Sequence, residues 1–115
     1  MSKEIRGYLN ESFRVFYNQG VPKEEVLPHY HDFRKIVILL GGNIGYMVEE
    51  QQYNLKPGSI VFVDAGKIHR PLLHKNDEYE RIIIYLSDEF LRSRPGLLGA
   101  FETMENRGTY VADAP

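Results

Sequence analysis

Three of the four histidines have the residue type and spacing that bind a metal ion or a polar ligand. His29 and His31 form a His-x-His pair, and His69 lies farther along, directly after Ile68. Alternate side chains of an extended strand point to the same face, so the pair presents both imidazoles together. Imidazole binds Zn, Fe, Mn, Cu and Ni, so three converging rings would form a divalent transition-metal site. A chance pairing or a hydrogen-bonded core pair is the alternative interpretation.

The segments that must position these histidines alternate between short apolar runs and turns. The apolar runs are rich in β-branched and aromatic residues, which favour strands: 36–38, 60–63 and 82–85. The turn segments between the runs are 41–43, 49–51, 56–58, 64–66 and 75–77. Turn signals at roughly 8–12-residue spacing are typical of an all-β sandwich or small barrel.

The two ends of the chain differ from this pattern. Residues 1–12 have weak periodicity and are expected to form an N-terminal arm, and residues 13–17 alternate as in a strand partly buried on both faces. Ser87 followed by two acids predicts a helix start, with Pro95-Gly96 ending that helix. Residues 97–101 predict a second short helix, and the polar residues 106–115 are expected to lead away from the domain. We therefore expect an all-β barrel over 13–91 and a helical or linker tail over 92–115.

Length and composition narrow the function classes. The 115 residues suit one domain, with 14 Lys+Arg against 16 Asp+Glu and a net charge of −2. A near-neutral balance argues against direct nucleic-acid binding, which needs a basic face. The absence of cysteine excludes disulfides and thiolate metal sites. No apolar run is long enough for a membrane span, and the first residues lack the apolar core of a signal peptide, so a cytoplasmic protein without a membrane partner is expected.

The histidine motifs resemble those of the cupin family, whose fold is a double-stranded β-helix or jelly-roll-like barrel. The first cupin motif is His-x-His, a Glu and a Gly, and residues 29–35 followed by Gly41-Gly42 match its spacing. The second motif runs from Gly through Pro-x-Gly to His, and residues 58–69 match it. Two positions depart from the pattern. Lys35 stands where the family has its metal-binding Glu, and Asp64 stands where the family has Pro.

The lysine bears directly on the metal interpretation. In metal-dependent cupins the carboxylate is the fourth protein ligand and supplies negative charge, whereas a protonated Lys35 repels a cation and has no lone pair to donate. A metal site with His29, His31 and His69 as its three ligands is still an alternative. We expect, however, that the domain binds no cofactor.

A finer resemblance is to the N-terminal ligand-binding domain of AraC-type transcription regulators. It rests on the ordered set 29–35, 36–42, 55–59, 65–69 and 79–91, and covers most of the chain. The resemblance implies that a small-molecule effector, often a sugar or other metabolite, binds inside the barrel. It also implies a homodimer, an N-terminal arm over the ligand, and DNA binding only through a C-terminal helix-turn-helix domain absent from this chain.

Under this interpretation the inner face becomes a polar pocket. The strand parity of His29 and His31 places Lys35 on that face, where it would donate to a hydroxyl, carboxylate or phosphate. The alternative is that Lys35 reaches out of the barrel mouth into solvent. Tyr46, Phe62 and Tyr85 are candidates for walls that stack on a ligand, with ordinary core packing as the alternative for each.

Two other functions are alternatives to the sensor. A stand-alone metal-dependent cupin enzyme, an oxygenase or isomerase, would use His29, His31 and His69, and Lys35 counts against it. The other is a storage or scaffold barrel with a filled interior. No nucleophile elbow, P-loop or paired-carboxylate motif is present, so the sequence predicts a sensor and not an enzyme.

Overall fold

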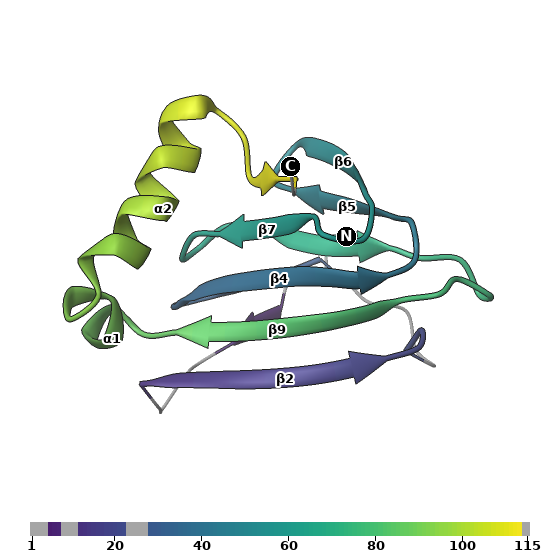
Figure 1. The fold of residues 1–115 in the computed structure, drawn as a ribbon, viewed down its shortest axis with the longest axis horizontal. Coiled ribbons are helices and arrows are strands. Elements are labelled where there is room, and N and C mark those ends of the chain that lie inside the picture. Colours follow the sequence, from purple (N-terminus) through teal and green to yellow (C-terminus); the bar gives the residue numbers. More distant parts are fainter. Residues whose placement is uncertain (1–4, 8–11, 23–27, 114–115) are drawn as a thin grey trace.

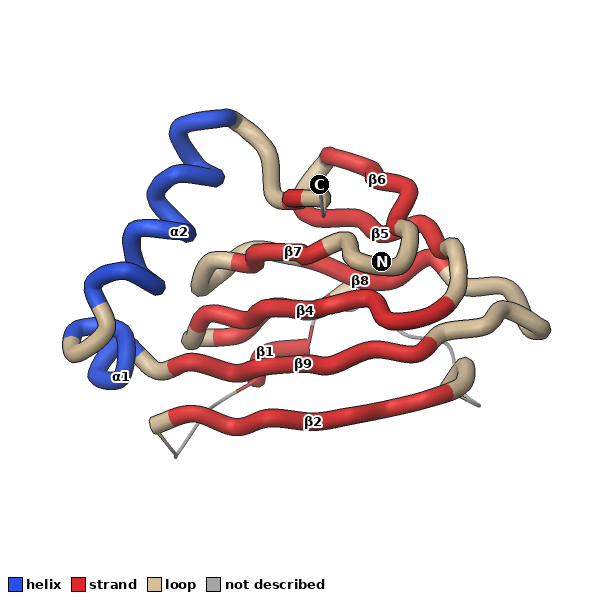
Figure 2. The backbone as a smooth tube through the Cα atoms, in the orientation of Figure 1, coloured by secondary structure: helices blue, strands red, loops and turns tan. Residues whose placement is uncertain are grey.

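The computed structural model describes residues 5–7, 12–22 and 28–113, which form two facing β-sheets with two helices at one side (Figure 1). In spatial order the first sheet contains β1 (Ile5–Gly7), β3 (His29–His31), β8 (His69–Leu72), β5 (Ile44–Val48) and β6 (Gln51–Leu55). The second contains β10 (Val111–Ala112), β7 (Ile60–Val63), β4 (Arg34–Gly41), β9 (Glu80–Leu86) and β2 (Phe13–Gln19). Strands distant in sequence are therefore neighbours, as Figure 2 shows for β4 between β7 and β9. The predicted all-β barrel with C-terminal helices is confirmed.

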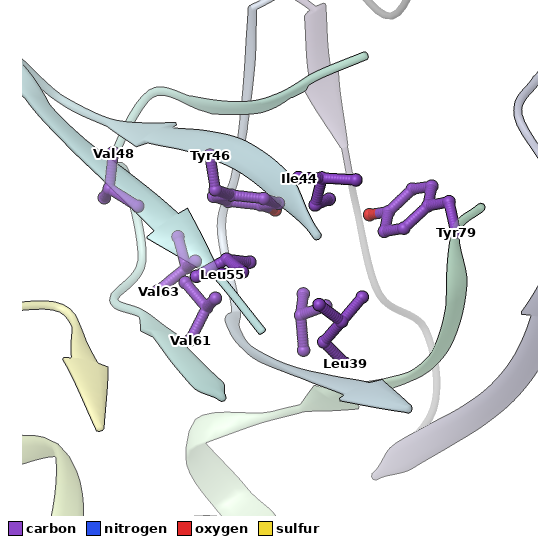
Figure 3. Packing of buried hydrophobic residues seen from close by; sticks show 9 residues of the cluster. Leu39, Ile44, Tyr46, Val48, Leu55, Val61, Val63 and Tyr79 are labelled. Carbon is purple, nitrogen blue, oxygen red and sulfur yellow. The ribbon is translucent and has the colours of Figure 1, made fainter. Parts of the chain in front are cut away.

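The main core fills the space between the sheets (Figure 3). Strand β4 shows how alternation builds it, because Val37 and Leu39 point into the barrel and are 1% and 0% exposed. The intervening Ile36 belongs to a second cluster on the outer face of the same sheet. The remaining buried members of the main cluster are Ile44, Tyr46, Val48, Leu55, Val61, Val63 and Tyr79. Both faces of β4 are thus packed.

The helices cover part of that outer face. Helix α1 (Asp88–Arg92) begins as the sequence predicts, with the Ser87 hydroxyl accepting from the Phe90 amide at 3.1 Å. Helix α2 (Pro95–Arg107) begins where the first helix was expected to end, because proline's fixed φ and missing N–H suit a first helical turn. It is longer than the short helix predicted, and Gly108 ends it in the left-handed conformation. Among the described helices none is long and apolar enough to cross a membrane.

Two peripheral segments differ from expectation. Strand β2 was expected to be partly buried on both faces, but Phe13, Val15 and Tyr17 are about half exposed. The strand lies at the edge of its sheet and pairs only with β9, so the helices leave most of its outer face uncovered. The polar tail was expected to lead away from the domain. Instead, β10 pairs with β7, and the buried Ser59 hydroxyl donates to Asp113 at 2.6 Å.

The turn after β4 yields a test of the fold. Gly42 has φ of +100°, and a Cβ there would lie 1.9 Å from the Glu78 carbonyl oxygen. We expect Gly42→Ala to lower the free energy of unfolding by about 3 kcal/mol or more, since it adds backbone strain to a clash. Gly99→Ala is the matched control in α2, where an added Cβ meets nothing within 4 Å. Urea unfolding of both variants measures this, and equal stabilities would contradict it.

Candidate functional site

Strands β3 and β8 bring the three predicted histidines together. His29 pairs in register with His69, and the two ring centroids are 4.2 Å apart. The ring of His31 lies 5.1 Å from each of the other two. One nitrogen from each ring lies within 4.8 Å of the others. The predicted convergence of the rings inside the barrel is therefore observed, and it comes from strand parity together with the β3–β8 pairing.

Lys35 enters this cluster from the opposite sheet. Its side chain is 5% exposed and its Nζ lies 3.2 Å from His69 Nε2. The other nitrogen of His69, Nδ1, lies 2.8 Å from the Lys67 carbonyl oxygen, to which it donates. That bond assigns the proton to Nδ1 and leaves the Nε2 lone pair to accept from Lys35. The alternative of a lysine reaching into solvent is therefore wrong.

Burial controls the charge of the cluster. Desolvation, followed by the charges of Lys35 and His29, lowers the pKa of His31 to about 3. Desolvation also lowers the pKa of His69 to about 2, again with Lys35 as the next cause. The pKa of Lys35 falls to about 7, through desolvation first and the neighbouring Arg81 second. Near neutral pH both imidazoles are uncharged, so they accept or donate hydrogen bonds as neutral rings.

Aromatic side chains surround the cluster, although not all those expected. Tyr85 lies opposite Lys35 in the β4–β9 register, and its ring centroid is 5.4 Å from that of His31. Phe33 adds a ring 4.6 Å from His31. Tyr46 is 1% exposed and belongs to the adjoining apolar core.

Phe62 is placed elsewhere. It packs against Phe101 of α2 at 5.3 Å, because β7 turns Val61 and Val63 inward and Phe62 outward. The expectation that Phe62 forms a pocket wall is thereby corrected.

Arg81 is a further functional candidate, and it belongs to neither of the two cupin motifs described above. It is 8% exposed, donates to the carbonyls of Gly20 and Tyr79 at 2.7 and 2.9 Å, and stacks on the Tyr79 ring. Its charge is one of the two causes that lower the pKa of Lys35. The parity of Arg81 and Tyr85 on one strand would have placed both on the inner face.

The donor set does not fit the metal site of the cupin pattern. Two of its features suit a metal: the three converging rings, and the buried nitrogens of His31, which have no hydrogen-bond partner among the described residues. However, the Nε2 lone pair of His69 already accepts from Lys35, and the position of the family's carboxylate holds an amine. A cation would have to displace that hydrogen bond and face the lysine charge.

The ordered motifs and the barrel agree with a family comparison. A profile of the AraC-like ligand binding domain matches residues 15–108. The chain belongs to this family. Its barrel is similar to a cupin 2 conserved barrel protein from Salinispora arenicola, with a TM-score of 0.59 and 14% identity over 74% of this chain and 71% of the other. A comparison with curated protein sequences gave no match.

Two further solved structures share the fold of this AraC-like domain. An RmlC-like cupin with a double-stranded β-helix fold from Methanocaldococcus jannaschii has a TM-score of 0.57 and 20% identity, over 69% of this chain and 74% of the other. Vicilin from tomato (Solanum lycopersicum) has a TM-score of 0.57 and 26% identity over 67% of this chain. The domain spans only 23% of that vicilin chain.

The position of Lys35 in the cluster predicts that Lys35→Glu binds zinc more tightly than the wild type. The substitution restores a carboxylate ligand and frees the His69 lone pair, so zinc should raise the melting temperature of Lys35→Glu at slightly acidic pH. Lys75→Glu is the control because Lys75 is exposed in a turn. Calorimetric titration with zinc measures the affinities. Equal zinc affinity in the wild type and Lys35→Glu would contradict this prediction.

The lowered pKa of Lys35 predicts how stability depends on pH. The unfolded lysine titrates near its ordinary value, so between about pH 7 and pH 10 the unfolded state binds one more proton than the folded state. The free energy of unfolding should therefore rise with pH in this window, by up to about 1.4 kcal/mol per pH unit. Lys35→Met should remove that rise and Lys75→Met should keep it, as measured by chemical denaturation. A rise that persists in Lys35→Met would show that another group causes it.

Proposed function

We propose that this domain is the effector-sensing part of an AraC-type transcription regulator, and that it binds a small polar molecule inside the barrel. The observation that carries the proposal is the polar cluster of Lys35, His31 and His69, which adjoins the apolar core inside the barrel. Burying such groups costs free energy unless partners compensate, and both His31 nitrogens lack a partner among the described residues. A bound effector would supply one.

The cluster favours binding over catalysis. A general base works best with a pKa near the operating pH, whereas the pKa values of His31 and His69 lie far below it. No carboxylate is buried in the part of the chain that the structure describes, so the acid–base pairs of many hydrolases and isomerases have no counterpart there. The cupin enzyme interpretation also needs a metal that Lys35 opposes. We therefore propose a non-enzymatic sensor.

Strand β4 offers a route from the ligand to the helices. Arg34, adjacent to Lys35, points to the outer face and pairs with Asp88 of α1 at 2.9 Å and with Asp64 at 3.0 Å. Its guanidinium also lies 5.7 Å from the ring centroid of Phe101 in α2. A ligand that shifts Lys35 would move the strand that anchors both helices. The ligand would change the balance between the original and the shifted position of β4 only if it bound these two conformations with different affinity.

The regulatory part of the proposal extends beyond this domain. In the proposed regulator the domain forms a homodimer in the cytoplasm, and DNA is bound by a helix-turn-helix domain outside this sequence. The net charge of −2 supports the proposal that this domain does not itself bind DNA, because the chain lacks the excess of basic residues that phosphate binding needs.

The sensor proposal predicts that binding depends on His31. A panel of sugars, sugar acids, amino acids and aromatic acids is screened by thermal shift. A binding compound should raise the melting temperature of the wild type and do so less in His31→Phe, which removes both ring nitrogens while keeping an aromatic ring. Hits are confirmed by calorimetry.

His74→Phe is the matched control, because His74 is an exposed residue outside the cluster. It should respond to each hit as the wild type does. Hits that bind His31→Phe with wild-type affinity would place the ligand elsewhere and contradict the proposed site. Circular dichroism of the three proteins confirms that each variant is folded.

A further inference from the structure

The barrel interior holds positive charge that no described carboxylate balances. The buried polar and charged residues are Lys35, Ser59, His69 and Arg81. Two of these are basic, Arg81 as a cation and Lys35 as a partly protonated amine near neutral pH, and neither forms an ion pair within the ranges 5–7, 12–22 and 28–113. The partners of Arg81 are backbone carbonyls, and the partner of Lys35 is a neutral imidazole. An uncompensated buried cation is unfavourable, and the usual compensation is an anion.

Several hydrogen-bonding atoms around this charge also lack partners. Both nitrogens of His31 and the Nε of Arg81 are buried without a hydrogen bond to any described residue. A neutral imidazole has one N–H donor, and the arginine Nε carries another. The ammonium of Lys35 has three N–H groups, and its hydrogen bond to His69 uses only one of them. Most of the unsatisfied hydrogen-bonding groups in the interior are therefore donors. An anion with several acceptor oxygens would accept hydrogen bonds from them.

Three acidic residues that lie near the cluster in the described part of the chain do not balance this charge. Asp64 pairs with Arg34 on the outer side of β4, and Glu80 accepts from the Tyr17 hydroxyl. Asp32 is exposed, and its charge makes only the smallest contribution to the pKa of His31. None of these three acids is buried.

We propose that the effector is an anion, and specifically a small organic molecule whose carboxylate pairs with Lys35 and accepts from His31. This inference rests on the proposed function and names the chemical class of the ligand. A carboxylate carries the one negative charge that the Lys35 ammonium needs, while Arg81 keeps its backbone carbonyl partners. A phosphate dianion would cost more to remove from water. The rings of Phe33 and Tyr85, 4.7 Å apart, adjoin the polar cluster and suit the apolar part of such a molecule.

The test uses pairs of probes that share a skeleton and differ in charge: benzoate against benzamide, lactate against lactamide, and glucuronate against glucose. Each probe is titrated into the 115-residue chain and followed by calorimetry and by NMR signals of the histidine rings. The carboxylate members should bind and shift the His31 signals, and their neutral partners should bind at least about tenfold more weakly, as expected for losing one charge-assisted hydrogen bond.

Lys35→Met should weaken carboxylate binding by about tenfold or more, because it removes the charge and keeps a side chain of similar length. Lys35→Gln is a second variant that retains a neutral donor, and Lys75→Met is the control lysine. Melting curves establish that each variant is folded.

Three outcomes would overturn the anion inference. They are stronger binding of the neutral partners, carboxylate binding that Lys35→Met leaves unchanged, and the absence of binding by every carboxylate probe. None of them decides the proposed function, which depends on the metabolite screen and its His31→Phe comparison. A neutral effector that requires His31 would uphold the sensor and refute the anion.

Discussion

The hydrogen bond from Lys35 to His69 joins the two sheets inside the barrel, and the rest of the site depends on it. It connects β4 with β8 across the interior at 3.2 Å. It occupies the lone pair that His69 would otherwise give to a metal, while the Lys67 carbonyl fixes the proton on the other nitrogen. Both ring nitrogens of His69 are thus occupied. By contrast, both ring nitrogens of His31 lack a partner among the described residues. One substitution in the cupin pattern thus determines which groups can meet a ligand.

Strand β4 places the site and the helices on opposite faces of one backbone. Lys35 and Val37 point into the barrel. On the opposite face, Ile36 packs beneath the helices and Arg34 forms an ion pair with Asp88 of α1. The strand is central in its sheet, hydrogen-bonded to β7 on one side and β9 on the other, so it cannot shift without moving both neighbours. The proposed interior ligand would therefore be connected to the outer helices through the adjacent residues Lys35 and Arg34. A sensor needs such a connection, and a storage barrel does not.

Much of this arrangement follows from local sequence rules. Alternation placed Lys35 beside the histidines, and glycine-containing turns such as Pro57-Gly58 marked where strands end. The errors have a common cause. Alternation shows that a strand has two faces, but tertiary packing decides which face meets the core, so Phe62 was assigned to the pocket although it lies beneath α2. Likewise, the carbonyl partners of Arg81 come from Gly20 and Tyr79, and only the folded chain brings the Gly20 carbonyl to Arg81.

The electrostatic consequence of Lys35 extends to the kind of molecule that the barrel can accept. In a cupin with a carboxylate at this position, three neutral imidazoles and one negative charge attract a cation. With lysine at the same position, the neutral imidazoles of His31 and His69 lie near a positive charge, so an anion is attracted in place of a cation. Burial lowers the pKa of Lys35 to about 7, so the empty site is only partly charged near neutral pH. An anion that binds there stabilises the ammonium, and binding is therefore coupled to uptake of a proton by the lysine.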